Sequence, residues 1–192
     1  MADDAIDAAL VARAVAGDAA AFDRLVERWQ DRVFRLARRF FRRGEDAEEV
    51  AQEVFMKLYA TLPRYRADAP FEHYLLRIAT NACHDKLRRR RSRPETPAGD
   101  RTGETAAWLD RALRGRAIEA AQAEEARGLA ADLLARLPPK DRIVLVLLDL
   151  EGRSSAEVAQ ATGSTRAAVK IRAMRARRAL RRLLTGLPEE RP

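Results

Sequence analysis

The residues best able to do chemistry lie near the carboxyl end, where positive charge gathers on one predicted helix. Between positions 166 and 182 the chain has eight basic side chains and no acidic one. Like charges four residues apart on a helix repel each other by about 0.2–0.5 kcal/mol per pair. A polyanion would relieve this repulsion, so the pattern indicates binding to a phosphate backbone, and DNA is the expected partner.

A helix-turn-helix pattern places this basic helix. Gly163 can adopt a left-handed turn without steric cost, and Ser154 with Glu157 has the capping-box spacing that starts a helix. Ala159 and Val169 stand where the motif needs a small residue and an apolar anchor. An apolar stripe on the second helix is expected to pack inward: Val169, Ala173, Ala176, Leu180 and Leu183. Basic residues largely off that stripe are expected to face phosphates: Arg166, Lys170, Arg177 and Arg181.

Acidic side chains gather on another predicted helix, over residues 46–59. Asp46, Glu49 and Glu53 are spaced to share one face of this helix. A metal-dependent nuclease could use such carboxylates, but no suitably placed third ligand accompanies the Glu49/Glu53 pair. We therefore interpret the cluster as a noncatalytic acidic face.

Cysteine and histidine do not indicate a metal site. Cys83 is the one cysteine in the sequence, which excludes an intramolecular disulfide and a CxxC motif. His73 and His84 are separated by about 16 Å along a helix axis, too far to share one zinc ion. The sequence thus predicts no catalytic residue, no metal and no cofactor, and the chain is not expected to be an enzyme.

Helical spacing dominates the elements that must position these residues. The first predicted helix covers residues 10–16 and ends at Gly17, and Asp18 caps a second helix that Gly44 ends. A third begins at Asp46, a proline-containing loop covers 63–70, and a fourth helix covers 71–91. An apolar helix over 140–150 precedes the helix-turn-helix. The predicted fold class is all-α, with two small helical domains over residues 1–92 and 117–187, joined by a flexible linker over 93–116.

Composition restricts where such a protein works. The 192 residues carry a formal net charge of +8, which suits a polyanionic partner. The amino terminus lacks the basic and apolar regions of a signal peptide, and the longest apolar run, 143–148, is far below the roughly 20 residues that span a bilayer. We expect a cytoplasmic protein with no membrane insertion.

Five motifs occur in an order that resembles one family. They are GDAAAF (17–22), DAEEVAQEVFMKLY (46–59), FEHYLLRIATNACHDKLRRRR (71–91), LPPKDRIVLVLLDLEGRS (137–154) and the helix-turn-helix. Together they are similar to ECF-type sigma factors, of the sigma-70 family of bacterial RNA polymerase. The resemblance implies a first domain that binds core RNA polymerase and recognises and melts the −10 promoter element. It implies a second domain that reads the −35 element, and control by an anti-sigma factor.

The resemblance assigns three groups of site residues in this chain. Core-polymerase binding is implied for Asp46, Glu49, Gln52 and Glu53. Binding of −10 DNA is implied for Arg64, Tyr65, Arg66, Phe71, Asn81, Arg88, Arg89, Arg90 and Arg91, with Asn81 nearest to a flipped base. Packing is the alternative role for Tyr65 and Phe71, and the favoured one for Phe71. Lys170, Ile171 and Met174 are implied to face −35 base edges, and Thr165, Arg166, Arg172 and Arg175 phosphates or groove edges.

A few positions depart from the family pattern. Tyr59 and Tyr74 stand where the family often has tryptophan, and Ile171 replaces a usual small polar residue. We therefore predict no −35 consensus. A dimeric helix-turn-helix transcriptional repressor is the alternative function; it would explain the second domain but leave the 46–59 and 71–91 helices without a role.

Overall fold

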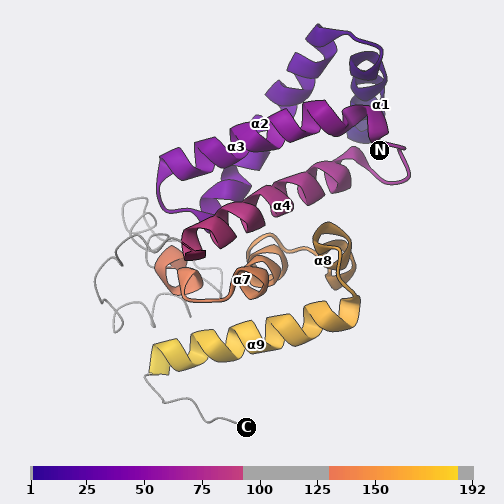
Figure 1. The fold of residues 1–192 in the computed structure, drawn as a ribbon. Helices are drawn as coiled ribbons and strands as arrows, with labels where there is room; N and C mark the ends of the chain where they lie inside the picture. Colours follow the sequence, from indigo (N-terminus) through magenta and orange to yellow (C-terminus); the bar gives the residue numbers. More distant parts are fainter. Residues whose placement is uncertain (1, 93–129, 186–192) are drawn as a thin grey trace. The chain divides into compact units, whose positions relative to one another are not determined.

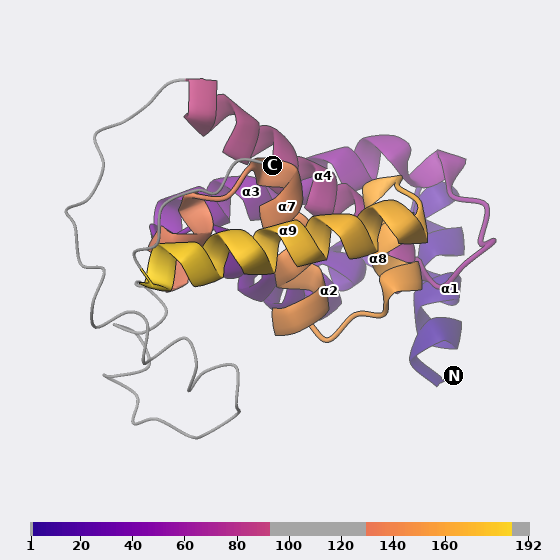
Figure 2. The same ribbon diagram turned by 90° about the horizontal axis from the view of Figure 1, so that it is seen from below.

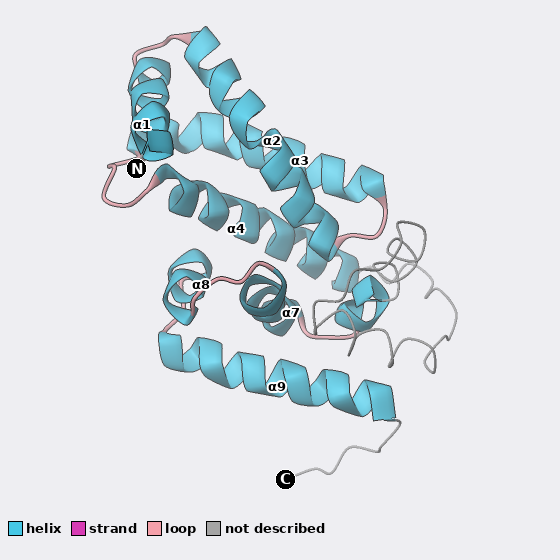
Figure 3. Cartoon of the chain, turned by 180° about the vertical axis from the view of Figure 1, so that it is seen from behind, coloured by secondary structure: helices cyan, strands magenta, loops and turns pink. Residues whose placement is uncertain are grey.

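The computed structural model describes residues 2–92 and 130–185, and helices make up most of this part of the chain (Figure 1). Neither of these two ranges contains a β-strand (Figure 3). The chain divides into two compact units, formed mainly by residues 1–86 and mainly by residues 87–192. The predicted all-α class in two helical parts is confirmed. The predicted linker, 93–116, and the start of the second domain at 117 lie outside the described residues.

The first unit is built from four α-helices and one short 3-10 turn. These elements are α1 (Ala2–Val15), α2 (Ala19–Phe40), α3 (Gly44–Thr61), η1 (Leu62–Arg64) and α4 (Phe71–Ser92), of which α4 continues past residue 86. α2 packs against both α1 and α3, and α1 also contacts η1 (Figure 1). Leu25, Val54 and Leu58 have no exposed surface, because their helical spacing turns them to the same inner side.

Capping explains where α1 and α2 meet. Gly17 has φ +96°, a left-handed conformation that ends α1, and the Asp18 carboxylate accepts a hydrogen bond from the Ala21 amide at 3.1 Å. Hydrogen bonds from Arg13 and from the Ala21 amide lower the pKa of Asp18. The predicted cap is therefore confirmed, although α1 begins at Ala2 rather than near residue 10.

The prediction that Gly44 ends the second helix is wrong. α2 ends at Phe40, Phe41 is extended with φ −126° and ψ 127°, and Gly44 is the first residue of α3. Both phenylalanines are almost fully buried, at 2% and 1% exposure. Consecutive residues on a helix point about 100° apart. The helix therefore ends before the glycine, and both rings pack inward where it ends.

The second unit contains the helix-turn-helix. A helical segment ending at residue 135 precedes α7 (Pro139–Leu145), the π-helical turn η2 (Val146–Leu150), α8 (Ser155–Thr162) and α9 (Arg166–Thr185). The predicted helix over 140–150 is thus an α-helix that changes into a π turn, where the Glu151 amide donates to the Val146 carbonyl five residues earlier. α7 packs against α9 (Figure 2), and Val144, Val158 and Val169 are buried.

Candidate nucleic-acid and protein interfaces

Local hydrogen bonds set the geometry of the helix-turn-helix. The Ser154 amide donates to Glu157 Oε2 at 2.9 Å, and the Glu157 amide donates back to Ser154 Oγ at 3.3 Å, so the predicted capping box is present. Gly163 has φ +60° and turns the chain between α8 and α9. Thr165 Oγ1 accepts from the Ala168 amide at 3.1 Å and thereby caps α9. Thr165, expected at a phosphate or groove edge, therefore has a structural role at the helix start.

The two sides of α9 differ sharply in exposure. Four of the five residues of the predicted inward stripe are buried, and Leu183 is half-buried: Val169, Ala173, Ala176, Leu180 and Leu183. On the other side Ile171 is 47% exposed and Met174 is 62% exposed, beside exposed Lys170 and Arg175. Large apolar side chains exposed among basic ones suit a surface that meets both thymine methyl groups and phosphates.

Two arginines of α9 pair with aspartates of α7 and η2. Arg172 donates to Asp141 at 3.3 Å, and Arg177 makes two bonds to Asp149, at 2.6 and 3.1 Å. Hydrogen bonding to Asp149 raises the pKa of Arg177. Arg177, expected to face phosphates, is therefore paired with a carboxylate from η2 rather than from its own helix. Arg172 is half-buried at this pair, so it does not lie on the exposed side with Lys170.

The acidic residues of α3 are divided between two environments. Asp46 is only 8% exposed and lies 3.4 Å from the ammonium group of Lys86, which also pairs with Glu49. Glu53 pairs with Lys57 at 2.7 Å. Asp46 and Glu53 thus turn toward ion pairs within the fold, whereas Glu49 and Gln52 are exposed. The structure does not bring the four residues predicted for polymerase binding onto one open face.

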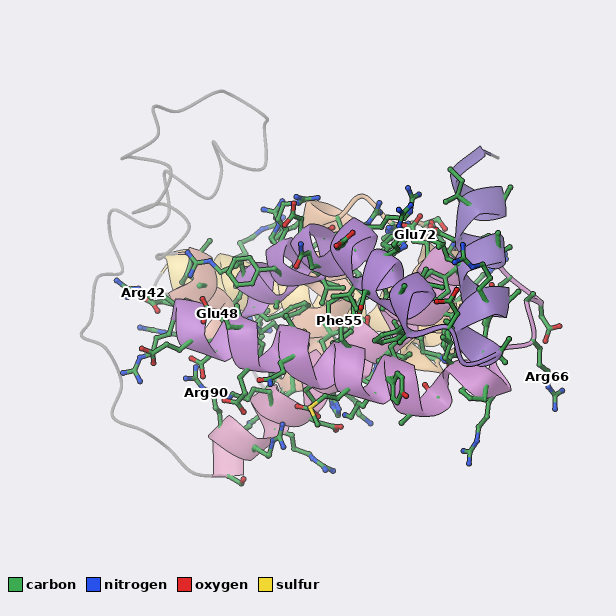
Figure 4. The ribbon with its side chains drawn as sticks, turned by 90° about the horizontal axis from the view of Figure 1, so that it is seen from above. Arg42, Glu48, Phe55, Arg66, Glu72 and Arg90 are labelled. Carbon is green, nitrogen blue, oxygen red and sulfur yellow. The ribbon has the colours of Figure 1, made fainter. Side chains whose placement is uncertain are left out.

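Sequence reasoning missed the exposed face of α3. Met56 is 66% exposed and Tyr59 is 69% exposed, with the Tyr59 ring edge-on to Phe22 at a centroid distance of 5.0 Å. The exposed Glu45 and Glu48 lie toward the start of the same helix, where Figure 4 labels Glu48. At 100° per residue, positions 45, 48, 52, 56 and 59 project to the side opposite Val50 and Val54. That spacing could have identified the face from the sequence.

An aromatic cluster fixes the loop between η1 and α4. The Tyr65 hydroxyl donates to the Ala69 carbonyl at 2.6 Å, and the Tyr74 hydroxyl donates to the Thr61 carbonyl at 2.9 Å. The Tyr65 ring lies 5.0 Å from the Tyr74 ring and 5.9 Å from the Phe71 ring. Phe71 is 3% exposed, so its role is packing, as favoured above, and Tyr65 is half-buried.

The loop presents its charged residues outward. Arg64 and Arg66 are exposed, and Figure 4 shows Arg66 extending away from the helices. Between Arg66 and Asp68, Ala67 has φ +56°, a left-handed conformation that costs a non-glycine residue about 1 kcal/mol or more. The hydrogen bond that closes the loop across Tyr65 and Ala69 holds this backbone in place.

The residues predicted on α4 are largely accessible. Asn81 is exposed, as are Arg88, Arg89 and Arg91, whereas Arg90 is half-buried. Cys83 is buried on the opposite side of the same helix, and His84 Nδ1 lies 3.8 Å from Asp85. Over residues 2–92 and 130–185, no three His, Cys, Asp or Glu side chains are grouped to hold a metal ion. Within the same ranges, no helix is both long and apolar enough to cross a membrane.

Comparison with known families matches both units to regions of the sigma-70 family. The Sigma-70 region 2 family matches residues 25–93, and the Sigma-70, region 4 family matches residues 127–183. The chain is 36% identical to the ECF RNA polymerase sigma factor SigM of Mycobacterium tuberculosis over 186 residues, which cover 93% of this chain and 84% of that relative.

Two solved structures have a similar fold. CnrH, solved in complex with the cytosolic domain of CnrY, has a TM-score of 0.64 and 29% identity, covering 95% of this chain and 99% of CnrH. The sigma factor RpoE of Bartonella quintana, solved with the anti-sigma factor NepR, has a TM-score of 0.57 over 85% of this chain and 96% of RpoE. At 19% identity the second likeness bears on the fold alone.

Proposed function

Because the chain belongs to the sigma-70 family of RNA polymerase sigma factors, within its ECF group, we propose that its two units divide promoter recognition between them. The protein is a sigma factor that binds core RNA polymerase and directs it to specific promoters. The observation that carries the DNA-reading half is the outer side of α9, where Ile171 and Met174 are exposed among basic residues.

The second unit is proposed to read the −35 element through this outer side. Lys170 would donate to base edges, and Ile171 and Met174 would meet apolar base groups such as thymine methyls. Arg166 and Arg175, both exposed, would bind phosphates and fix the register of the helix. Thr165 would contribute by starting α9 in the correct direction.

The first unit is proposed to recognise and open the −10 element through the loop after η1 and the exposed face of α4. Asn81 would hydrogen-bond a base taken out of the stack, and Arg64 and Arg66 would attract the strand to the loop. Tyr65 would hold the loop in shape through its bond to Ala69. The arginines at the end of α4 would bind adjacent phosphates: Arg88, Arg89, Arg90 and Arg91.

Core polymerase is proposed to bind the exposed face of α3. Glu49 and Gln52 remain from the residues first expected there, and Met56 and Tyr59 add an apolar contact area at one end. Asp46 supports this face from within, because its ion pair with Lys86 joins α3 to α4, and Glu53 pairs with Lys57 along α3 itself. Aromatic residues and methionine are enriched in protein interfaces, which supports this end of the face as the main contact.

A protein regulator is the further partner that we propose. CnrH was solved bound to the cytosolic domain of CnrY, and an anti-sigma factor that covers the exposed α3 face of this chain would block core binding. The working site is the cytoplasm, where RNA polymerase acts. The function is noncatalytic, because polymerase performs the chemistry and this chain supplies recognition.

Run-off transcription with purified core polymerase on a genomic promoter library tests the proposal. Ile171→Ala is expected to keep core binding but to weaken initiation at −35-dependent promoters, by about 1–3 kcal/mol in promoter discrimination. Ile6→Ala is the matched control, because Ile6 has the same 47% exposure but lies on α1. Absence of promoter-specific initiation would contradict the proposal, and so would tight binding of the chain alone to a palindromic operator.

A further inference from the structure

One basic residue of α9, Arg177, forms an ion pair with a carboxylate of the same protein. Arg177 Nη2 donates to Asp149 Oδ1 at 2.6 Å, and Arg177 Nε donates to Asp149 Oδ2 at 3.1 Å. This is a bidentate guanidinium–carboxylate pair, the same geometry that arginine uses to bind a phosphate. Asp149 therefore occupies one of the two hydrogen-bonding edges of Arg177, the edge formed by Nε and Nη2.

The neighbouring basic residues are in a different situation. Lys170, Arg175 and Arg178 are exposed, and no carboxylate of the described residues forms an ion pair with them. Arg172 lies on the other flank of the helix, half-buried against Asp141. Arg177 is the case that matters for DNA, because its side chain is 55% exposed and could reach a backbone if Asp149 released it.

The surroundings of Asp149 make release unfavourable. Its side chain is 20% exposed, so a free carboxylate there would lose both its partner and much of its hydration. It lies in the π turn η2, a rare backbone form that often occurs at functional positions. A phosphate approaching Arg177 would also meet the negative charge of Asp149.

We propose that Asp149 is a specificity-determining residue that withholds Arg177 from DNA phosphates. This inference rests on the proposed role of α9 in DNA binding. Phosphate contacts strengthen binding to every sequence equally, whereas base contacts discriminate. Neutralising one arginine lowers sequence-independent affinity and leaves Lys170, Ile171 and Met174 to discriminate among promoters.

The test uses the salt dependence of DNA affinity, because the slope of log affinity against log salt is proportional to the number of phosphates that the protein neutralises. We would titrate a fluorescein-labelled duplex without promoter sequence with the full-length protein, and follow anisotropy between 50 and 200 mM monovalent salt. For Asp149→Asn the slope of log affinity against log salt is expected to steepen by about 0.9, because one more phosphate is bound. Its advantage in affinity over the unmodified protein then shrinks about 3.5-fold across this salt range.

Two further variants identify the source of the change. Asp31→Asn, on the exposed surface of α2, removes one negative charge, as Asp149→Asn does. It is expected to leave the salt slope unchanged. Combining Asp149→Asn with Arg177→Gln is expected to abolish the gain. A gain that persists in the double variant, or appears equally in Asp31→Asn, would overturn the proposal.

The single variant Arg177→Gln provides a second test that does not depend on Asp149→Asn, which could disturb the packing of α9. The unmodified protein withholds this arginine, so Arg177→Gln is expected to leave the slope unchanged, whereas Arg175→Gln, at an exposed residue proposed to bind phosphate, is expected to reduce it by about 0.9. If Arg177→Gln reduced the slope as much as Arg175→Gln, the withholding of Arg177 would be overturned, but the proposed role of α9 in DNA binding would not. A slope that Arg175→Gln leaves unaltered would instead overturn the proposed role of α9, and the withholding with it.

Discussion

The capping box at the start of α8 allows a quantitative prediction about pH. Glu157 Oε2 accepts hydrogen bonds from the Ser154 hydroxyl at 2.7 Å and the Ser154 amide at 2.9 Å, and Oε1 accepts from Arg153 at 3.0 Å. These bonds favour the charged form and lower the pKa of Glu157 from 4.5 to about 2. Replacing Glu157 should therefore destabilise the start of α8 by an amount that depends on pH.

The magnitude follows from the shift. The difference between 4.5 and about 2 corresponds to about 3.4 kcal/mol as an upper limit, at 1.36 kcal/mol per pKa unit. The side chain is 28% exposed, and solvent screening reduces this to about 1–2 kcal/mol, the usual range for a helix cap.

The sign follows from the direction of the shift. A lowered folded-state pKa stabilises the protein above pH 4.5, and this contribution is lost as the pH falls toward 2. About three-quarters of the contribution should remain at pH 4 and about two-fifths at pH 3.

Amide hydrogen exchange of the α8 peptide in the full-length protein measures this locally. Glu157→Ala is expected to lower protection by about 1–2 kcal/mol at pH 7 and by progressively less at pH 4 and pH 3. Glu157→Gln keeps a hydrogen-bond acceptor and should show a smaller loss. Glu27→Gln, an exposed position on α2, is the control. A loss in Glu157→Ala that stays constant between pH 7 and pH 3 would refute the reasoning.

Three other predictions concern the turn, the loop and the α3 face. Gly163→Ala should lower the free energy of unfolding by about 1–2 kcal/mol in urea titrations, because φ is +60° while no atom lies within 4 Å of an added Cβ; an unchanged value would contradict the strain argument. Tyr65→Phe removes the bond to Ala69, so permanganate footprinting should detect weaker −10 opening with unchanged core binding, and normal opening would contradict the positioning role. Met56→Asp should weaken core binding in a pull-down titration whereas Ile6→Asp should not, and equal effects would exclude a specific α3 contact.

Much of the second unit could be predicted because its determinants are local. The capping box joins residues three positions apart, Gly163 needs its left-handed turn whatever surrounds it, and the inward stripe repeats every three or four residues. Helical periodicity alone assigns an inside and an outside to such an element. The same periodicity could have identified the exposed face with Met56 and Tyr59.

The use of individual charges could not be predicted in this way. Arg177 and Asp149 are 28 residues apart, Arg172 and Asp141 are 31 apart, and Lys86 and Glu49 are 37 apart. A charge pattern shows where charges concentrate, but their partners depend on which helices pack together. The end of α2 was also missed, since the helix ends at Phe40, before the glycine that was expected to end it.

The sequence by itself therefore determined the all-α class, the helix-turn-helix with its caps, and the family to which the ordered motifs belong. Tertiary structure alone decided which charged residues remain for partners and which bind one another within the fold. The physical reason is that helix formation depends on contacts within a few residues, whereas an ion pair between two helices forms only where packing brings distant side chains within about 4 Å.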